Sequence, residues 1–234
     1  MNTKTKPFFS ALIITSAILS ACSSNEIGES RDVNQDKIYM DYSVRHTEGD
    51  ANVDVYCTFR FGGINGTTLV LNGDSQVELD GEKLKVDSSD FSGAYYKASR
   101  PLKSFYGKHS ISFTNIAGKK FVNEFEYAPF SISSQSQEAT KSKDLILSCE
   151  SAPLTAADHI QVNSSGTDSS FHFTQEGPAS TLLVPAKELM RQKGNSISVE
   201  CSLYREMGLK QSAPEGGVIR IRQELKPVKI KLVP

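Results

Sequence analysis

Residues 38–45 read Ile-Tyr-Met-Asp-Tyr-Ser-Val-Arg, and this stretch indicates how the chain folds. Every second residue is apolar or aromatic and large, and Asp41, Ser43 and Arg45 stand between them. A period of two is typical of a β-strand with one face in a core and the other in solvent. Residues 53–59 repeat the pattern, with the apolar side made by Val53, Val55, Cys57 and Phe59.

The same signal continues along the chain, and no long helical period interrupts it. Asp80-Gly81 separates two short apolar runs and is a strong hairpin signal. Short strands joined by turn residues predict an all-β sandwich or barrel. The predicted strands cover residues 38–45, 53–59, 68–71, 76–79, 84–86, 110–114, 121–127, 144–149, 159–163, 171–174, 196–204, 218–222 and 228–233.

A weak internal repeat favours two domains. Residues 109–113 (His-Ser-Ile-Ser-Phe) match residues 195–199 (Asn-Ser-Ile-Ser-Val). Each copy follows a segment opened by proline and closed by glycine, which is typical of a short helical turn (Pro101 and Gly107, Pro185 and Gly194). We therefore predict one β-sandwich over residues 37–127 and a second over residues 128–234.

The N-terminus predicts export. Two lysines in the first six residues precede an apolar run, residues 8–19, that is too short to span a bilayer as a helix. The run ends in Leu19-Ser20-Ala21-Cys22, which resembles the lipobox of bacterial lipoproteins. That resemblance implies cleavage after residue 21, lipid on Cys22 and attachment to a membrane.

The resemblance also bears on location and on the segment that follows. Ser23 stands where aspartate would favour retention at the inner membrane, so the resemblance implies the outer membrane, on its periplasmic side or at the cell surface. Residues 22–36 are polar and lack periodicity, which predicts a flexible lipidated tether. The expected localisation is therefore the cell envelope.

Three further cysteines would lie in an oxidising compartment. Cys149 and Cys201 each share strand parity with apolar neighbours, so both are predicted to face a common core. A disulfide between them would contribute about 4 kcal/mol in the chain-entropy model. Cys57 is predicted to be a buried free thiol, with a reactive or metal-binding thiol as the alternative.

The mature part resembles the tandem immunoglobulin-like domains of bacterial surface proteins. The features that carry this resemblance are the Cys149–Cys201 pair, the hairpin strands and the short helical turn before residues 195–199. The chain departs from it in having no Trp, and in having Val199 rather than Tyr two residues before Cys201. The resemblance implies a fold and carries no functional residues.

Composition and motifs indicate little chemistry. Without residues 1–21, which carry Lys4 and Lys6, the balance of 26 basic and 27 acidic residues becomes 24 against 27. Such a balance gives no electrostatic footprint for nucleic acid. Residues 32–36 resemble the start of a calcium loop, but Lys37 replaces the required glycine. The histidines are scattered and predicted to face solvent, so no metal, cofactor or catalytic residue is predicted.

The C-terminal strands carry the one surface that suggests binding. Basic side chains alternate there with apolar ones, which predicts a basic outward face made by Arg220, Arg222, Lys226, Lys229 and Lys231. Contact with anionic lipid, cell-wall polymer or an acidic partner is one interpretation. The alternative is that these charges protect an edge strand from aggregation.

Three hypotheses of function follow. The first is a lipid-anchored, non-catalytic binding or scaffold module of the cell envelope, with an envelope protein or cell-wall partner. The second is an accessory subunit of an envelope export or adhesion assembly. The third is a hydrolase with no recognisable motif.

Overall fold

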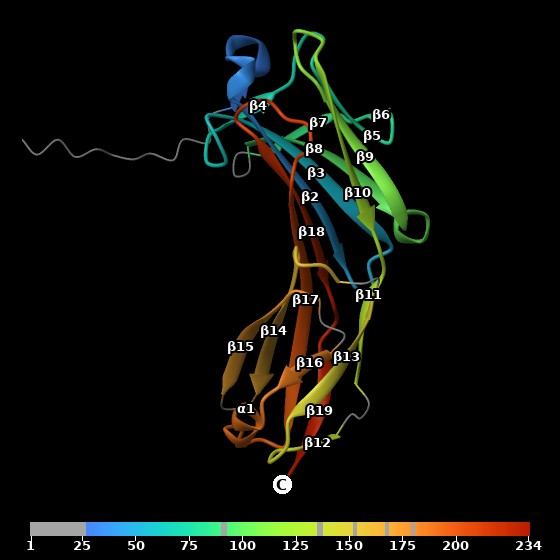
Figure 1. Cartoon of the computed structure of the whole chain (residues 1–234), viewed down its shortest axis with the longest axis vertical. Coiled ribbons are helices and arrows are strands. Elements are labelled where there is room, and N and C mark those ends of the chain that lie inside the picture. Colours follow the sequence, from blue (N-terminus) through green and yellow to red (C-terminus); the bar gives the residue numbers. More distant parts are fainter. Residues whose placement is uncertain (1–26, 90–92, 135–137, 152–153, 167–168, 179–180) are drawn as a thin grey trace, which may run out of the picture.

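The computed structural model describes residues 27–89, 93–134, 138–151, 154–166, 169–178 and 181–234. Almost every described element is a β-strand, and Figure 1 shows two strand-rich bodies arranged along the long axis. Each body is a sandwich with its own buried core. The predicted all-β class, built from β-sandwiches, is confirmed. The predicted signal segment and the predicted lipidation site, Cys22, lie outside the described residues.

The first sandwich packs six strands of a large sheet against a second, four-stranded sheet. Its core includes Phe59 and Phe113 from the two facing sheets, with ring centroids 4.5 Å apart. The strands from the large sheet are β1 (Ile27–Glu29), β2 (Ile38–Thr47), β3 (Asn52–Phe61), β4 (Thr67–Val70), β7 (Val86–Ser89) and β8 (Gly93–Pro101). The facing sheet contains β5 (Gln76–Leu79), β6 (Glu82–Lys83), β9 (Gly107–Thr114) and β10 (Lys120–Tyr127).

The second sandwich uses other strands of the same large sheet. Val162 and Leu182 come from its two sheets, and both are fully buried in its core. The large sheet contributes β12 (Glu138–Thr140), β14 (Asp158–Gly166), β15 (Ser170–Glu176), β17 (Ser196–Gly208) and β19 (Val228–Val233). The facing sheet contains β11 (Phe130–Ser134), β13 (Leu145–Ser151) and β16 (Thr181–Val184).

One hairpin joins the two sandwiches. Strand β17 begins in the second sandwich, and its C-terminal part pairs antiparallel with β18 (Gly217–Glu224). Strand β18 in turn pairs in parallel with β2, and its Ile219 and Ile221 belong to the first core. The predicted division into residues 37–127 and 128–234 therefore does not describe the first sandwich fully, because β18, a strand from the later range, completes it.

The helical segments are short. The expected turns after Pro101 and Pro185 are confirmed as a 3-10 turn, Leu102–Ser104, and α1, Ala186–Met190. Two further 3-10 turns, Ser30–Asp32 and Gln35–Lys37, precede β2. Within the described part of the chain, no helix has the length and apolar character needed to cross a bilayer.

The segment predicted as a tether differs from that prediction over its described part. Residues 27–29 form β1, which pairs in parallel with β4. Ser30 is fully buried, and the Gln35 side-chain amide donates to the Ser30 carbonyl at 2.6 Å. These contacts fix residues 27–36 on the first sandwich, because polar side chains there satisfy local backbone groups rather than solvent alone.

The cysteine predictions are partly wrong. Cys149 and Cys201 do face the same core from β13 and β17, but they are unbonded thiols, so the predicted disulfide is absent. Strand parity predicts that both side chains face one core, but a disulfide also requires a specific distance and orientation of the two cysteines, which parity does not determine. Cys57 is fully buried and unbonded, as predicted.

Several strands were not predicted from the sequence, and β8 and β16 show why. Strand β8 has small residues, Ala94 and Ala98, at two of its buried positions, which weakens the apolar side of its alternation. Strand β16 has only four residues. Both are held by pairing with strong neighbours, β3 and β13, rather than by their own propensity.

Candidate functional site

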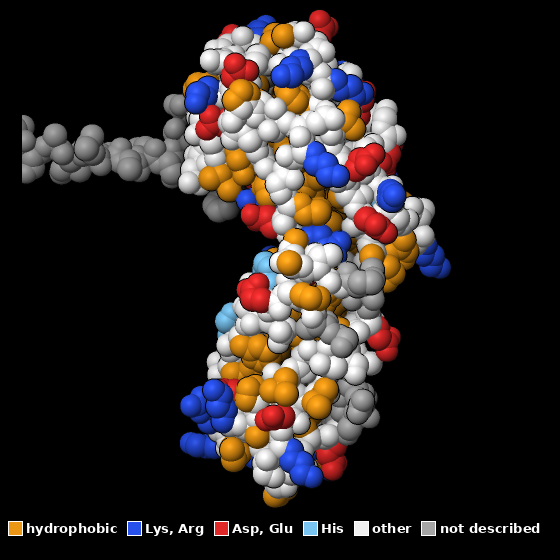
Figure 2. Space-filling model, in the orientation of Figure 1, with side chains coloured by type: hydrophobic (Ala, Val, Ile, Leu, Met, Phe, Trp, Pro, Cys, Tyr) orange, Lys and Arg blue, Asp and Glu red, His pale blue; other side chains and the backbone are white. Residues whose placement is uncertain are grey.

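The outward face of the large sheet is rich in arginine and tyrosine where the two sandwiches meet. These residues occupy the strand positions that alternate with the buried core residues. We call this surface the arginine–tyrosine face, and it consists of Arg45, Tyr56, Arg60, Tyr95, His159, Tyr204, Arg220 and Arg222. Figure 2 shows that the molecule is hollowed on one side between its two halves.

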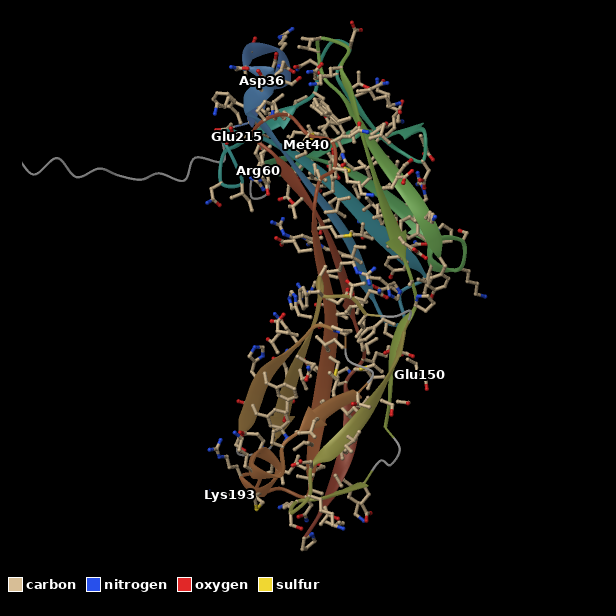
Figure 3. All side chains as sticks on the ribbon, viewed as in Figure 1. Asp36, Met40, Arg60, Glu150, Lys193 and Glu215 are labelled. Carbon is tan, nitrogen blue, oxygen red and sulfur yellow. The ribbon has the colours of Figure 1, made fainter. Side chains whose placement is uncertain are left out.

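Strand pairing brings these residues together. Tyr56 on β3 lies opposite Ser43 on β2, and Ser43 lies beside Arg220 on β18. Arg222 lies opposite Tyr204 on β17, and Tyr204 lies opposite His159 on β14. A row of adjacent strands thus carries the face from the first sandwich to the second. In the stick view of Figure 3, Arg60 lies in the first sandwich, where it stands on β3 opposite Tyr39 of β2.

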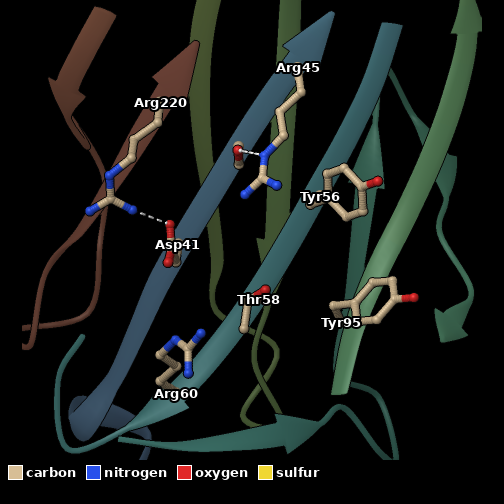
Figure 4. A pocket seen from close by; sticks show the side chains of 8 residues that line it. Asp41, Arg45, Tyr56, Thr58, Arg60, Tyr95 and Arg220 are labelled. Carbon is tan, nitrogen blue, oxygen red and sulfur yellow. Dashed lines mark hydrogen bonds and ion pairs between the residues drawn. The ribbon is translucent and has the colours of Figure 1, made fainter. Parts of the chain in front are cut away.

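Three hollows indent this face, and Arg45 lines all three. The largest has a volume of about 340 Å³ and lies over Thr58 of β3. Figure 4 shows Arg45, Arg60 and Arg220 placed around it, with Tyr56 and Tyr95 along one side. A second hollow, of about 210 Å³, lies between His159, Tyr204 and Arg45 and therefore spans the two sandwiches.

Aromatic rings and cations support one another across the face. The Arg45 guanidinium lies 5.2 Å from the centroid of the Tyr56 ring, and the Arg222 guanidinium lies 5.0 Å from that of Tyr204. His159 stacks on Tyr204 with ring centroids 5.2 Å apart. Such contacts contribute about 0.5–1 kcal/mol each at exposed sites and hold long side chains in defined positions.

The arginines differ in their charge partners. Arg220 donates to Asp41 at 2.6 Å and to Glu206 at 2.9 Å, and these two acids outweigh its partial burial, so its pKa lies above the ordinary value. Arg222 forms an ion pair with Glu224. Arg45 donates to the Ser43 hydroxyl at 2.9 Å, and neither it nor Arg60 has an ion pair with a described acid. These two guanidinium groups are available to an anion.

A buried ion pair fixes the junction beside the face. Arg205 contacts Asp158 through two N–H groups, at 2.6 and 3.0 Å, and the Asp158 side chain is fully buried. Burial alone would raise the pKa of Asp158, but hydrogen bonds from Arg205 and Thr155 lower it below its ordinary value. The carboxylate therefore stays ionised and orients Arg205 under the second hollow.

The structure separates the five basic residues predicted from sequence. Arg220 and Arg222 lie on the arginine–tyrosine face, whereas Lys229 and Lys231 lie opposite serines of β17, in the second sandwich. Lys226 follows β18, and its backbone N–H donates to Glu48. Lys231 forms an ion pair with Glu138. The five residues do not form one continuous basic patch.

The edge-strand explanation is wrong for the charges on β18. Strand β18, which carries Arg220 and Arg222, lies between β17 and β2 and is not an edge. Strand β12 pairs only with residues 231–233 of β19, so the part of β19 that carries Lys229 pairs with β17 alone. Alternation along a strand indicates its buried face and does not indicate which strands pair with it. Charges on an interior strand have no edge to protect.

Two kinds of residue were not recognised from the sequence. Arg45, Tyr56 and Arg60 alternate with predicted core residues, so their outward direction was predicted, but their proximity to Arg220 was not. His109 was predicted to face solvent and does not. Its side chain is only 10% exposed, lies 2.7 Å from Asp80, and stacks on Phe105.

Comparisons with known proteins give no family. No protein-family model matches the chain, and no curated protein matches it. Solved structures that resemble it include the first two immunoglobulin domains of DIP-gamma, at 14% identity, a TM-score of 0.22, and coverage of 80% of this chain and 95% of that one.

Two further solved structures are similar at the same low level. A cytokine receptor complex matches at 12% identity with a TM-score of 0.36, covering 81% of this chain and 95% of that one. A bacterial ice-binding adhesin matches at 12% identity with a TM-score of 0.26, covering 83% of this chain and 64% of that one. At these TM-scores the likeness assigns neither a family nor a function.

Proposed function

We propose that this chain is a lipid-anchored, non-catalytic binding module of the cell envelope that recognises an envelope protein through the arginine–tyrosine face. The observation that carries the proposal is the gathering of four arginines and three tyrosines from five strands onto one hollowed surface. Arginine and tyrosine are the residues that most often dominate binding energy at protein interfaces, because each offers a large contact area and directed hydrogen bonds.

The rigidity of the surface supports this role. Its side chains stand on paired strands of one sheet rather than on loops, so little conformational entropy is lost on binding. The β17–β18 hairpin connects the two sandwiches at this point, and the Asp158–Arg205 pair ties β14 to β17 beside it. An acidic partner would meet Arg45 and Arg60, which have no acidic partner among the described residues.

Photo-crosslinking in intact cells tests the interface. A photoreactive phenylalanine at Tyr204 should capture a discrete partner, whereas the same residue at Ile146 should not. Ile146 is the matched control because it is 49% exposed and lies on the three-stranded sheet of the second sandwich. Arg222→Glu should reduce capture from Tyr204 at least fivefold. Equal capture from Tyr204 and Ile146 would reject the proposal.

The anchor is tested separately. Cys22→Ala should abolish incorporation of labelled palmitate and release the protein from the membrane fraction, because two or three acyl chains are needed for stable attachment. Ser23→Asp is a second variant, which should move the protein from outer-membrane to inner-membrane fractions. Unchanged palmitate labelling of Cys22→Ala would remove the anchor from the proposal and leave the interface to be judged by crosslinking.

A further inference from the structure

We propose that the hollow over Thr58 binds a phosphate monoester, carried by a small molecule or by a lipid headgroup. The inference rests on the proposed role as a binding module and assigns a ligand to one part of its face. The hollow is lined by Asp41, Ser43, Arg45, Tyr56, Thr58, Arg60, Tyr95 and Arg220 (Figure 4).

The charge of the hollow fits such a ligand. Three arginines and one carboxylate line it, which leaves a formal charge of two positive units. Asp41 is already paired with Arg220, so its charge is screened from a ligand near Arg45 and Arg60. A phosphate monoester carries about −1.5 to −2 charges at neutral pH, whereas a carboxylate carries one.

Arg60 provides an independent observation. Its Nε atom is buried and has no hydrogen-bond partner, and one of its terminal nitrogens donates only a long bond, 3.5 Å, to the Gly66 carbonyl. A buried guanidinium N–H without an acceptor is costly, since arginine loses hydration there and gains nothing in return. A phosphate oxygen is the acceptor that a guanidinium fork binds most readily.

The remaining lining groups complete the site. The hydroxyls of Ser43 and Thr58 stand on neighbouring strands under the hollow and can donate to phosphate oxygens. Both tyrosine hydroxyls are turned to other acids, Tyr56 to Asp54 at 3.4 Å and Tyr95 to Asp87 at 3.2 Å. Their rings therefore form a wall, and the volume of about 340 Å³ leaves room for the group that carries the phosphate.

Calorimetry on the full chain in a neutral detergent tests the site. Glucose 1-phosphate should bind, and glucose should not. Glucuronate, which carries a carboxylate, should bind at least tenfold more weakly. Arg60→Gln and Arg45→Gln should each weaken glucose 1-phosphate binding at least tenfold, and Arg60→Lys should restore it only in part, because lysine lacks the fork. Lys229→Gln, which removes the same charge elsewhere on the sheet, should bind as the parent does.

Vesicles distinguish the two sources of the phosphate. If the site reads a lipid headgroup, vesicles of phosphatidylcholine with phosphatidic acid should bind more tightly than vesicles with phosphatidylglycerol, and Arg60→Gln should remove the difference. If it reads a soluble ligand, the two vesicles should bind equally while glucose 1-phosphate still binds. Unchanged thermal midpoints of the variants exclude unfolding as the cause.

The proposal is overturned if glucose 1-phosphate and phosphatidic acid both fail to bind, or if they bind Arg60→Gln and Arg45→Gln as tightly as the parent. Tighter binding of glucuronate than of glucose 1-phosphate would also overturn it. If these ligand-binding tests fail but a protein is still captured by crosslinking from Tyr204, only the phosphate site is rejected. If the ligand-binding tests fail and no protein is captured from Tyr204, the proposed function is rejected as well.

Discussion

Ile221 of β18 lies beside Val44 of β2 in parallel register, and both side chains are buried, with exposures of 3% and 0%. The two residues lie far apart in the chain and in different predicted domains. Their contact places a strand from the later half of the chain inside the first core. The two sandwiches are therefore joined by a shared sheet as well as by the connection between β10 and β11.

Gly217 permits this contact. A Cβ atom there would lie 2.4 Å from the Met40 carbonyl oxygen and 2.5 Å from a Leu209 methyl. Gly217→Ala should therefore lower the free energy of unfolding by about 2 kcal/mol, because backbone of β2 or β18 must shift. Urea unfolding monitored by circular dichroism measures this change in the free energy of unfolding.

Gly208→Ala is the matched control for that substitution. It lies opposite Val218 in the same hairpin, and nothing lies within 4 Å of its Cβ position. Its free energy of unfolding should change by less than about 0.5 kcal/mol. Equal effects of the two alanines would show that the close approach of β18 to β2 contributes nothing to stability.

The Asp158–Arg205 pair should make stability depend on pH. The pKa of Asp158 is lower in the folded protein than in the unfolded chain, so the pair stabilises the fold above the unfolded pKa, and this contribution is lost as pH falls through the folded pKa. Asp158→Asn should lower the free energy of unfolding by about 3 kcal/mol at pH 7.

The difference between parent and Asp158→Asn should shrink below about pH 4, where the unfolded aspartate becomes protonated. Urea unfolding of both proteins between neutral and acidic pH measures this. Glu206→Gln is the control, because Glu206 is 61% exposed and its pair with Arg220 should contribute less than about 1 kcal/mol. A difference that is constant with pH would contradict the ionic role of Asp158.

Asn123 should stabilise the open side of β10. Its side-chain amide donates to the Gln211 carbonyl at 2.8 Å and its oxygen accepts from the Gln211 N–H at 3.0 Å, while Val122 donates to the Gln211 side chain. Asn123 is 2% exposed. Asn123→Ala should lower the free energy of unfolding by about 2 kcal/mol, because the Gln211 backbone N–H and carbonyl lose their hydrogen-bond partners.

Hydrogen exchange gives the direct measurement for Asn123→Ala. Amides of β10 should exchange faster than in the parent, while those of β14 should not change. Lys119→Ala is the control, since its ammonium contacts only the Phe121 ring, at 4.9 Å from the centroid, among the side-chain contacts described. If the β10 amides of Asn123→Ala exchange as slowly as those of the parent, the stabilising role of the Asn123–Gln211 hydrogen bonds is contradicted.

The three thiols should differ in reactivity. Burial raises the pKa of Cys149, raises that of Cys201 to about 12, and raises that of Cys57 further. Only the thiolate is alkylated, so iodoacetamide at pH 8 should modify Cys149 first and Cys57 last. Peptide mass spectrometry follows the order, with denatured protein as the control, and modification of Cys57 as fast as Cys149 would contradict the burial.

Much of the strand content was predictable from sequence. Alternation at residues 38–45 and 53–59 predicted β2 and β3, and it predicted which of their side chains are buried. Proline and glycine spacing predicted the turns at Leu102–Ser104 and Ala186–Met190. These features depend on residues close in sequence, so local pattern is enough to define them.

The partners of each strand were not predictable in this way. A period of two shows which face of a strand is buried, but any strand with a matching apolar face can pair with it. Nothing in residues 217–224 indicates that they pair with β2. In the same way, the strand parity of Cys149 and Cys201 indicates that both face one core, but it does not indicate whether they form a disulfide.

The sequence by itself determined the all-β class, the inward and outward sides of the main strands, and the outward direction of Arg45, Tyr56 and Arg220. Only the tertiary structure decided that these residues share one face, because that depends on hydrogen-bond pairing between strands far apart in the chain. The need to bury apolar side chains determines the inward side of each strand by itself, whereas a binding surface is made by side chains from several neighbouring strands.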